Sequence, residues 1–249
     1  MLPVEAEPMP EAPSPAARAD EKPRLVREMF ASIAARYDLL NDVLSFRRHH
    51  AWRRTAARLT GLQPGDVALD VCSGTGDLAI ALAREVGPHG RVVGSDFCLP
   101  MLALGVPKLR RVRARVHLLA GDALRLPFRS GAFDAVAVGF GIRNVADTTR
   151  AMQEMARVTR AGGRVVCLEF TQPERGLLGA IVRAYQNRLL PRIGAVLSRA
   201  EAYRYLPQSI QAFHTAYELA GIMESVGLTE IRIHTLNFGS VCIHVGTKR

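Results

Sequence analysis

A glycine-rich turn between a strand pattern and a helix pattern constrains this chain most. Residues 69–77 read LDVCSGTGD: an apolar run breaks at Gly74 and Gly76, and helical spacing of apolar residues starts at Asp77. Glycine has no Cβ, so the backbone can turn tightly there and approach a bulky ligand. The next apolar run, VVGSDF, ends in Asp96, where a carboxylate can accept hydrogen bonds from ribose hydroxyls. The pattern predicts a site for an adenosine-containing cofactor.

The identity of that cofactor depends on one acidic residue. Residues 74–79 also fit the G-x-G-x-x-G/A dinucleotide pattern, whose pyrophosphate binds at a helix N-terminus. Asp77 lies in the first turn of the expected helix, where its charge would repel a diphosphate but tolerate a sulfonium or an amino group. This favours S-adenosylmethionine (SAM) over NAD. The alternative is that the glycines only make a tight connection.

Strand and helix patterns alternate from Val67 to Phe170. Such alternation predicts a parallel sheet with helices on both faces and ligands at the carboxyl ends of the strands. Two further strand patterns, 230–238 and 240–248, are close enough to form an antiparallel hairpin. We therefore expect an α/β class I SAM-dependent methyltransferase (Rossmann-like) fold, with a mostly parallel seven-stranded sheet that ends in this hairpin.

The flanking segments suggest how the domain is organised. Residues 1–24 are rich in Pro, Ala and Glu and predict a disordered tail, which leaves 25–249 as one domain. Helical spacing over 25–36 and 41–59, separated by Tyr37-Asp38, predicts an N-terminal helical cap at 25–60. A long helical segment without strand patterns, 171–214, predicts a lid insertion.

Charge and cysteine content limit the partners and the compartment. The net charge is +10, and basic residues gather in 47–58 and 108–115, which suggests an anionic partner such as a nucleic acid or a membrane surface. Solvated basic faces are the alternative. Aromatic residues make up 6% and do not alternate with the arginines, which argues against a stacking platform for single strands. The four cysteines lie far apart and are expected to be free thiols in a reducing cytoplasm.

Four stretches of the chain carry a resemblance to a known family. They are VREMFASIAARYDLLNDVLSF (26–46), ALDVCSGTGDLA (68–79), FGIRNVAD (140–147) and YRYLPQSI (203–210). With these stretches in this order, the chain resembles the ubiquinone/menaquinone biosynthesis C-methyltransferases over residues 25–249. The resemblance implies a SAM-dependent enzyme that methylates a ring carbon of a polyprenylated quinol. Demethylmenaquinol is the leading substrate, and a benzoquinol precursor of ubiquinone is the alternative.

The assignment of residues to cofactor binding rests partly on their position in the expected fold and partly on this resemblance. Position assigns Asp96 to the ribose, whereas the family pattern assigns Asp122-Ala123 to the adenine, with a helix N-cap as the alternative role of Asp122. The family commonly has Ser where this chain has Gly139, so only the backbone is available there. The predicted cofactor-binding residues are Asp70, Gly74, Thr75, Gly76, Asp96, Asp122, Ala123 and Gly139.

The resemblance also implies residues for the methyl acceptor. A quinol carbon becomes nucleophilic once a hydroxyl loses its proton. Arg143 would favour the phenolate, and a general base or a water molecule held by Asn144 would take the proton. A structural ion pair of Arg143 with Asp147 or Asp38 is the alternative.

Side chains from the cap and the lid would close over the acceptor ring. They are Tyr37, Asp38, Tyr203 and Tyr205, and simple packing is the alternative for the tyrosines. We assign Asp38 and Tyr205 to catalysis with the two residues above, and leave Glu169 unassigned.

The remaining expectations concern metals and partners. No His, Cys, Asp or Glu cluster has metal-ligand spacing, and His49 and His50, being adjacent, are expected on different helix faces, so no metal is predicted. The expected partner is a lipid quinol met at the membrane, without nucleic acid, and a homodimer is left open. This implies a cytoplasmic enzyme bound peripherally to the inner face of the membrane. A basic RNA- or membrane-binding module on the same scaffold is the non-enzymatic alternative.

Overall fold

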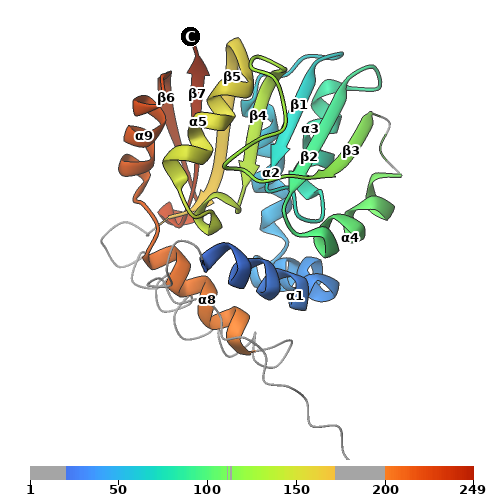
Figure 1. The fold of residues 1–249 in the computed structure, drawn as a ribbon, viewed down its shortest axis with the longest axis vertical. Coiled ribbons are helices and arrows are strands. Elements are labelled where there is room, and N and C mark those ends of the chain that lie inside the picture. Colours follow the sequence, from blue (N-terminus) through green and yellow to red (C-terminus); the bar gives the residue numbers. More distant parts are fainter. Residues whose placement is uncertain (1–20, 111, 113, 172–199) are drawn as a thin grey trace, which may run out of the picture.

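A seven-stranded sheet with helices on both faces forms the body of the protein (Figure 1). The computed structural model describes residues 21–110, 112, 114–171 and 200–249. The strands are β1 (Val67–Val71), β2 (Arg91–Asp96), β3 (Arg115–Ala120), β4 (Phe133–Gly139), β5 (Thr159–Phe170), β6 (Leu228–Leu236) and β7 (Val241–Lys248). The helices are α1 (Lys22–Leu44), α2 (Arg48–Leu59), α3 (Asp77–Val86), α4 (Leu99–Leu109), α5 (Thr148–Val158), α8 (Ala200–Gln211) and α9 (Ala216–Ser225), with 3-10 turns η1 (Ile142–Asn144) and η3 (Asn237–Gly239).

The strand order confirms the predicted class I methyltransferase fold. The strands lie in the order β3-β2-β1-β4-β5-β7-β6, and β7 is antiparallel to both of its neighbours while the other pairs are parallel. The chain passes from β1 outward to β2 and β3, and then returns to place β4 on the other side of β1. This topological switch point places a ligand crevice at the carboxyl ends of β1 and β4.

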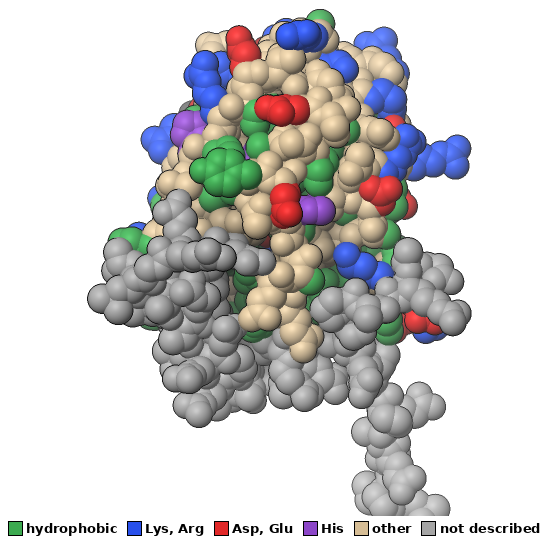
Figure 2. Space-filling view, turned by 90° about the vertical axis from the view of Figure 1, so that its left-hand side faces the viewer, with side chains coloured by type: hydrophobic (Ala, Val, Ile, Leu, Met, Phe, Trp, Pro, Cys, Tyr) green, Lys and Arg blue, Asp and Glu red, His purple; other side chains and the backbone are tan. Residues whose placement is uncertain are grey.

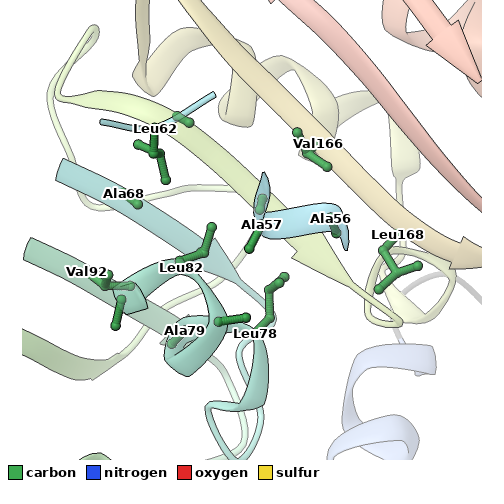
Figure 3. Packing of buried hydrophobic residues seen from close by; sticks show 14 of the residues in the cluster. Ala56, Ala57, Leu62, Ala68, Leu78, Ala79, Leu82, Val92, Val166 and Leu168 are labelled. Carbon is green, nitrogen blue, oxygen red and sulfur yellow. The ribbon is translucent and has the colours of Figure 1, made fainter. Parts of the chain in front are cut away.

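Two apolar layers hold the helices against the sheet. On one face, α2 and α3 pack against the strands through small and aliphatic side chains; Figure 3 labels Ala56, Ala57, Leu78, Ala79 and Leu82 from these two helices. On the other face, α5 and α9 bury methionines and leucines such as Met152, Met155 and Met223. Because both faces are covered, β1 is buried along almost its whole length and lacks the alternation of a half-exposed strand.

Helices α1 and α8 lie across the carboxyl ends of the parallel strands (Figure 1). The predicted break at Tyr37-Asp38 is wrong, because α1 runs unbroken from Lys22 to Leu44. The chain turns instead at Phe46 and Arg47, whose φ angles are +49° and +61°. Tyr37 and Asp38 can both make the i→i−4 hydrogen bonds of a helix, so they do not interrupt it. Two successive residues with positive φ angles, such as Phe46 and Arg47, leave the helical conformation and turn the chain.

Parts of the predicted tail and lid fall outside the described residues. These parts are 1–20 and 172–199, while α1 already begins within the segment assigned to the tail. The carboxyl part of the predicted lid is helical and forms α8. None of the described helices is long and apolar enough to cross a membrane.

Charged side chains on the described surface are spread out. On the face seen in Figure 2, Lys and Arg side chains are scattered among acidic, hydrophobic and uncharged atoms. The basic run 47–58 does not lie wholly on the surface either, because Arg53 is only 5% exposed. Its burial removes this guanidinium from any basic surface patch.

Candidate functional site

The glycine loop after β1 has the backbone that the sequence predicted. Gly74 and Gly76 have φ angles of +57° and +81°, a region that favours glycine, and Gly76 caps α3. The Gly74 N–H donates a hydrogen bond to Oδ2 of Asp96 over 2.8 Å. The other oxygen, Oδ1, accepts from the Cys98 N–H, also at 2.8 Å. Asp96 at the end of β2 therefore fixes the loop, and its burial raises the pKa of its carboxyl group.

Asp70 lies beneath the same loop, as predicted. Its Oδ2 accepts from the Ser73 hydroxyl over 2.7 Å, while its buried Oδ1 has no hydrogen-bond partner among the described residues. Burial raises the pKa of Asp70 to about 7, although the Ser73 hydrogen bond acts in the opposite direction. The carboxyl group is therefore poised to change charge near neutral pH.

These residues line a small cavity, which we call the cofactor cavity. Of the predicted cofactor residues, its wall includes Asp70, Gly74, Thr75, Asp96 and Gly139. Asp122 and Ala123 do not line it. Asp122 is exposed, and its Oδ1 accepts from the Leu124 N–H in a turn. Because no helix begins there, the alternative helix N-cap role of Asp122 is wrong.

The charges around the cofactor cavity suit a cationic ligand. Asp70, Asp77 and Asp96 all line it, and Arg53 is the only Lys or Arg among the described residues that does. Burial alone would raise the pKa of Asp77, but the positive charges of Arg53 and Lys108 hold it below its usual value. A diphosphate would meet three carboxylates here, whereas a sulfonium and an amino group are complementary to them. The residues present thus fit SAM.

A polar cluster joins α1 to the glycine loop. The Thr75 hydroxyl donates to Oδ1 of Asp38 over 2.6 Å, and Lys108 of α4 donates to Oδ2 of Asp38 over 2.9 Å. Lys108 also donates to Thr75 and to Asp77. We call Asp38, Thr75, Asp77 and Lys108 the α1 clasp. Asp38 lines neither this cavity nor the one described next, so the structure does not bring it over an acceptor ring.

A second and larger cavity of about 360 Å³ adjoins the first, and we call it the acceptor cavity. Its wall is mostly apolar and comes from α1, α2, α8 and the ends of β4, β5 and β6. Four residues belong to the walls of both cavities: Phe30, Tyr37, Arg53 and Phe140. A molecule in one cavity therefore lies next to a molecule in the other.

Arg143 lines the acceptor cavity and forms a buried ion pair that the sequence did not reveal. Its Nη1 lies 2.7 Å from Oε1 of Glu169, and the two side chains are 7% and 2% exposed. The same nitrogen donates to the Phe140 carbonyl oxygen over 2.7 Å. The expected alternatives, Asp147 and Asp38, are wrong: Asp147 caps α5, and Asp38 belongs to the clasp. Glu169, left unassigned above, is the partner.

Asn144 and Tyr205 connect the two cavities. The Tyr205 hydroxyl donates to Oδ1 of Asn144 over 2.9 Å. Asn144 lines the cofactor cavity, whereas Tyr205 of α8 lines the acceptor cavity. Burial raises the pKa of Tyr205, so its hydroxyl stays protonated and acts as a donor at neutral pH.

Asp42, His49 and His50 form a cluster beside the acceptor cavity that the sequence analysis did not predict, and His49 lines this cavity. Nε2 of His49 and Nε2 of His50 each lie 2.8 Å from Oδ1 of Asp42, and the two rings are 3.8 Å apart between centroids. The expectation that the two histidines lie on separate faces is wrong, because the turn at 46–47 folds the start of α2 back onto α1. The potential ligand atoms of the three residues lie within 4.8 Å of one another. The absence of a metal stays a prediction, since these hydrogen bonds already engage the three side chains.

Comparison with known proteins gives consistent matches over nearly the whole chain. The model of a family described as the ubiE/COQ5 methyltransferase family matches residues 17–248. A demethylmenaquinone methyltransferase of Deinococcus radiodurans is 46% identical over 236 residues, covering 94% of this chain and 97% of that protein. A demethylmenaquinone methyltransferase of Bacillus cytotoxicus is 40% identical over 229 residues, covering 91% and 97%.

A solved structure supports the fold. A SAM-dependent methyltransferase from Thermotoga maritima superposes with a TM-score of 0.63 at 18% identity, covering 90% of this chain and 100% of that one. At this identity the likeness concerns the architecture alone.

Proposed function

Because this chain belongs to the ubiE/COQ5 methyltransferase family, we propose that it transfers a methyl group from SAM to a ring carbon of demethylmenaquinol. One observation carries this proposal: a cofactor cavity built on the glycine loop shares part of its wall with a larger apolar cavity. The shared wall sets a methyl donor and an apolar ring side by side, the arrangement that an in-line transfer needs.

The apolar wall also supports a prenylated ring as the acceptor. Most of the acceptor cavity is formed by aromatic and aliphatic side chains, and its polar groups are few. Sites for small apolar molecules have this composition, with the polar groups fixing orientation. A naphthoquinol is favoured by the names of the relatives, and the benzoquinol precursor of ubiquinone stays the alternative.

The chain contributes orientation and charge to the reaction. Bound SAM would supply a methyl group on positively charged sulfur. Arg143 and Tyr205 line the acceptor cavity, and we assign to the guanidinium the stabilisation of the phenolate that forms when the quinol loses its proton. Asn144, which accepts from Tyr205, holds the water molecule that takes this proton. The methyl group would bond to the ring carbon as its bond to sulfur breaks, which would release S-adenosylhomocysteine. The ring proton would then pass to water and restore the aromatic system.

The other predicted residues have supporting roles in this proposal. Asp38 positions Thr75 through the α1 clasp instead of touching the acceptor. Asp70 supports the glycine loop from beneath, and Gly139 borders the cofactor cavity with its backbone. Asp122 and Ala123 remain the proposed contacts to the adenine, from the turn after β3.

A direct assay tests the proposed function. Purified protein would be incubated with SAM and either a prenylated demethylnaphthoquinol or a 2-methoxy-6-polyprenyl-benzoquinol, and the products identified by mass spectrometry. We expect a mass gain of one methyl group on the naphthoquinol ring. Methylation of the benzoquinol alone would move the assignment to ubiquinone biosynthesis, and methylation of neither would overturn a quinol C-methyltransferase.

Removing the acceptor-side groups should slow chemistry more than it weakens cofactor binding. Arg143→Lys loses the planar pair of donors, and Asn144→Ala loses the acceptor of Tyr205. We expect the single-turnover rate of each variant to fall on the order of a hundredfold, as when one preorganised donor is lost. Calorimetry should show nearly unchanged SAM affinity in Arg143→Lys and a loss in Asn144→Ala that is much smaller than its loss of rate, because Asn144 also lines the cofactor cavity. A native single-turnover rate in either variant would remove that residue from catalysis.

Asp96→Ala, by contrast, should mainly weaken SAM binding. The carboxylate fixes the glycine loop and is assigned to the ribose, so we expect SAM affinity to fall by roughly 1.5–3 kcal/mol, the scale of a charge-assisted hydrogen bond. Circular dichroism should show a retained fold. Wild-type affinity by calorimetry would exclude Asp96 from the cofactor site.

We further propose that the protein meets its lipid substrate at a membrane surface. Phe46 and Phe238 line the acceptor cavity yet are 74% and 61% exposed, and both have positive φ angles. Leu39 and Val43, which lie on α1 shortly before Phe46, are exposed apolar side chains as well. Exposed aromatic side chains at the mouth of an apolar cavity suit insertion into the interfacial region of a bilayer. A second copy of the chain covering these side chains is the alternative.

Binding to vesicles tests this surface. Phe46→Asn and Phe238→Asn keep a residue that tolerates positive φ. We expect each to weaken binding to anionic liposomes by about ten- to a hundredfold, because a buried Phe contributes about 1.5–3 kcal/mol. Tyr217→Asn, at an 84% exposed tyrosine on α9, is the matched control and should bind normally. Binding should weaken as salt rises. Equal binding by all variants would exclude this surface, and self-association in sedimentation velocity that the substitutions abolish would favour the dimer.

A further inference from the structure

Arg53 is a buried cation at the junction of the two cavities. It lies on α2, is 5% exposed and belongs to the walls of both the cofactor cavity and the acceptor cavity. Its guanidinium lies over the Phe140 ring, 5.2 Å from the centroid. No carboxylate among the described residues forms an ion pair with it. Its charge acts on the carboxylate of Asp77 without a direct ion pair, and a buried cation that lacks a direct ionic partner is costly, so a ligand anion that reaches Arg53 would bind favourably.

The neighbours of Arg53 orient it without neutralising its charge. Its Nη1 donates to Nδ1 of His49, and because Arg has no acceptor, this nitrogen must carry the lone pair. The other ring nitrogen of His49 then carries the proton and donates to Asp42 over 2.8 Å. Burial and the charge of Arg53 lower the pKa of His49, which keeps the imidazole neutral. A neutral imidazole fixes the guanidinium and leaves its charge free for a ligand.

Among the described residues, none of the other cations near the two cavities lines the cofactor cavity; Arg48, for example, lines the acceptor cavity only. Arg143 is bound to Glu169 and lines the acceptor cavity only. Lys108 is bound to Asp38 and Asp77 and lines neither cavity. Arg53 is therefore the cation available to an anionic group in the cofactor cavity.

We propose that Arg53 binds the α-carboxylate of the methionine moiety of SAM. This carboxylate is the only anionic group of the cofactor, and Arg53 and Asp77 present opposite charges on one cavity wall, complementary to the two charges of an α-amino acid. A guanidinium also matches the planar geometry of a carboxylate. The inference rests on the proposed function only in that SAM is the cofactor.

Removing the carboxylate from the ligand and the guanidinium from the protein tests this pairing. Calorimetry without any quinol would measure S-adenosylhomocysteine and its decarboxylated analogue against wild type, Arg53→Met and Arg53→Lys. We expect wild type to prefer S-adenosylhomocysteine by about ten- to a hundredfold, Arg53→Met to lose that preference, and Arg53→Lys to keep part of it. The affinity for the decarboxylated analogue should be nearly the same in all three proteins.

Controls separate this pairing from a structural role and from the proposed function. Arg54→Met changes the exposed arginine one residue further on and should keep the full preference. Equal weakening of both ligands by Arg53→Met would show that Arg53 only shapes the cavity. Equal binding of both ligands by wild type would overturn the proposal even if Arg53→Met does not fold. Because no quinol is present, none of these outcomes depends on the acceptor.

Discussion

Glu169→Ala should lower the free energy of unfolding by about 3–5 kcal/mol, the cost of leaving a buried partner charge unpaired. The substitution removes the ion-pair partner of the Arg143 guanidinium, which is 7% exposed. It also removes the oxygen that accepts a hydrogen bond from the Phe170 N–H over 2.8 Å. Urea denaturation monitored by circular dichroism would measure the change. The reason is desolvation: Arg143 loses its counterion and, at 7% exposure, regains little hydration in exchange.

Three variants show whether the buried charge causes this loss. Glu169→Gln keeps the shape and one acceptor oxygen, so its loss should be smaller. The double variant Arg143→Met/Glu169→Leu should recover much of the stability, because no charge remains buried. Glu28→Ala breaks the exposed pair with Arg24 and should change stability by less than about 0.5 kcal/mol. A loss in Glu169→Ala as small as that in Glu28→Ala would contradict the expected cost of the buried charge.

Asp70→Asn should change the free energy of unfolding of the cofactor-free protein differently at pH 8 and at pH 4. We expect the change at pH 8 to be more favourable to folding by on the order of 4 kcal/mol. The pKa of Asp70 is about 7 in the folded protein, compared with the ordinary value of 3.8 for the unfolded chain. Between these values the folded protein holds a proton that the unfolded chain has released, so the stability of wild type falls as pH rises through this window. Three pKa units correspond to roughly the stated free energy. Asparagine removes the titration, and urea denaturation at several pH values would measure it.

Asp134 provides a control of opposite sign. Partial burial acts to raise its pKa, but the Val67 N–H and Arg160 hold it below the usual value. Asp134 therefore stabilises the fold at pH values above its pKa in the unfolded chain. This contribution is lost as the pH falls through its lower pKa in the folded protein. Asp134→Asn should be most destabilising near neutral pH. A pH-independent effect of Asp70→Asn would show that Asp70 does not titrate in the predicted window.

The fold and the cofactor loop were predictable because local patterns encode them. Alternating strand and helix patterns predicted the parallel strands, and the two final strand patterns predicted the antiparallel end of the sheet. Gly74, Gly76 and Asp96 were found because a left-handed turn and a strand-end carboxylate are visible in a short window. The resemblance to a known family then added the proposed acceptor residues, but it did not indicate which side chains they contact.

Contacts set by the sheet and by chain reversal were not predictable in this way. Arg143 and Glu169 are 26 residues apart and meet only because β4 and β5 align in parallel, with Gly139 opposite Leu168. Arg53 stands in a run of basic residues that suggests a surface, and its burial follows from the way α2 packs. The turn at 46–47 lacks Gly, the usual sequence signal for a positive φ.

The α1 clasp sets a condition on how often the enzyme can turn over. Product release must free the spent cofactor from a cavity whose wall includes Phe30 and Tyr37 of α1. The clasp holds this helix by hydrogen bonds and ion pairs of partly exposed side chains, each of which contributes little in water. Beyond the clasp, α1 packs through Ala34 on Cys98 and Met101 in a small apolar cluster that is separate from the two apolar layers of the sheet, so those layers can stay packed while α1 moves. Exchange of the cofactor then requires only a local opening, far less costly than unfolding.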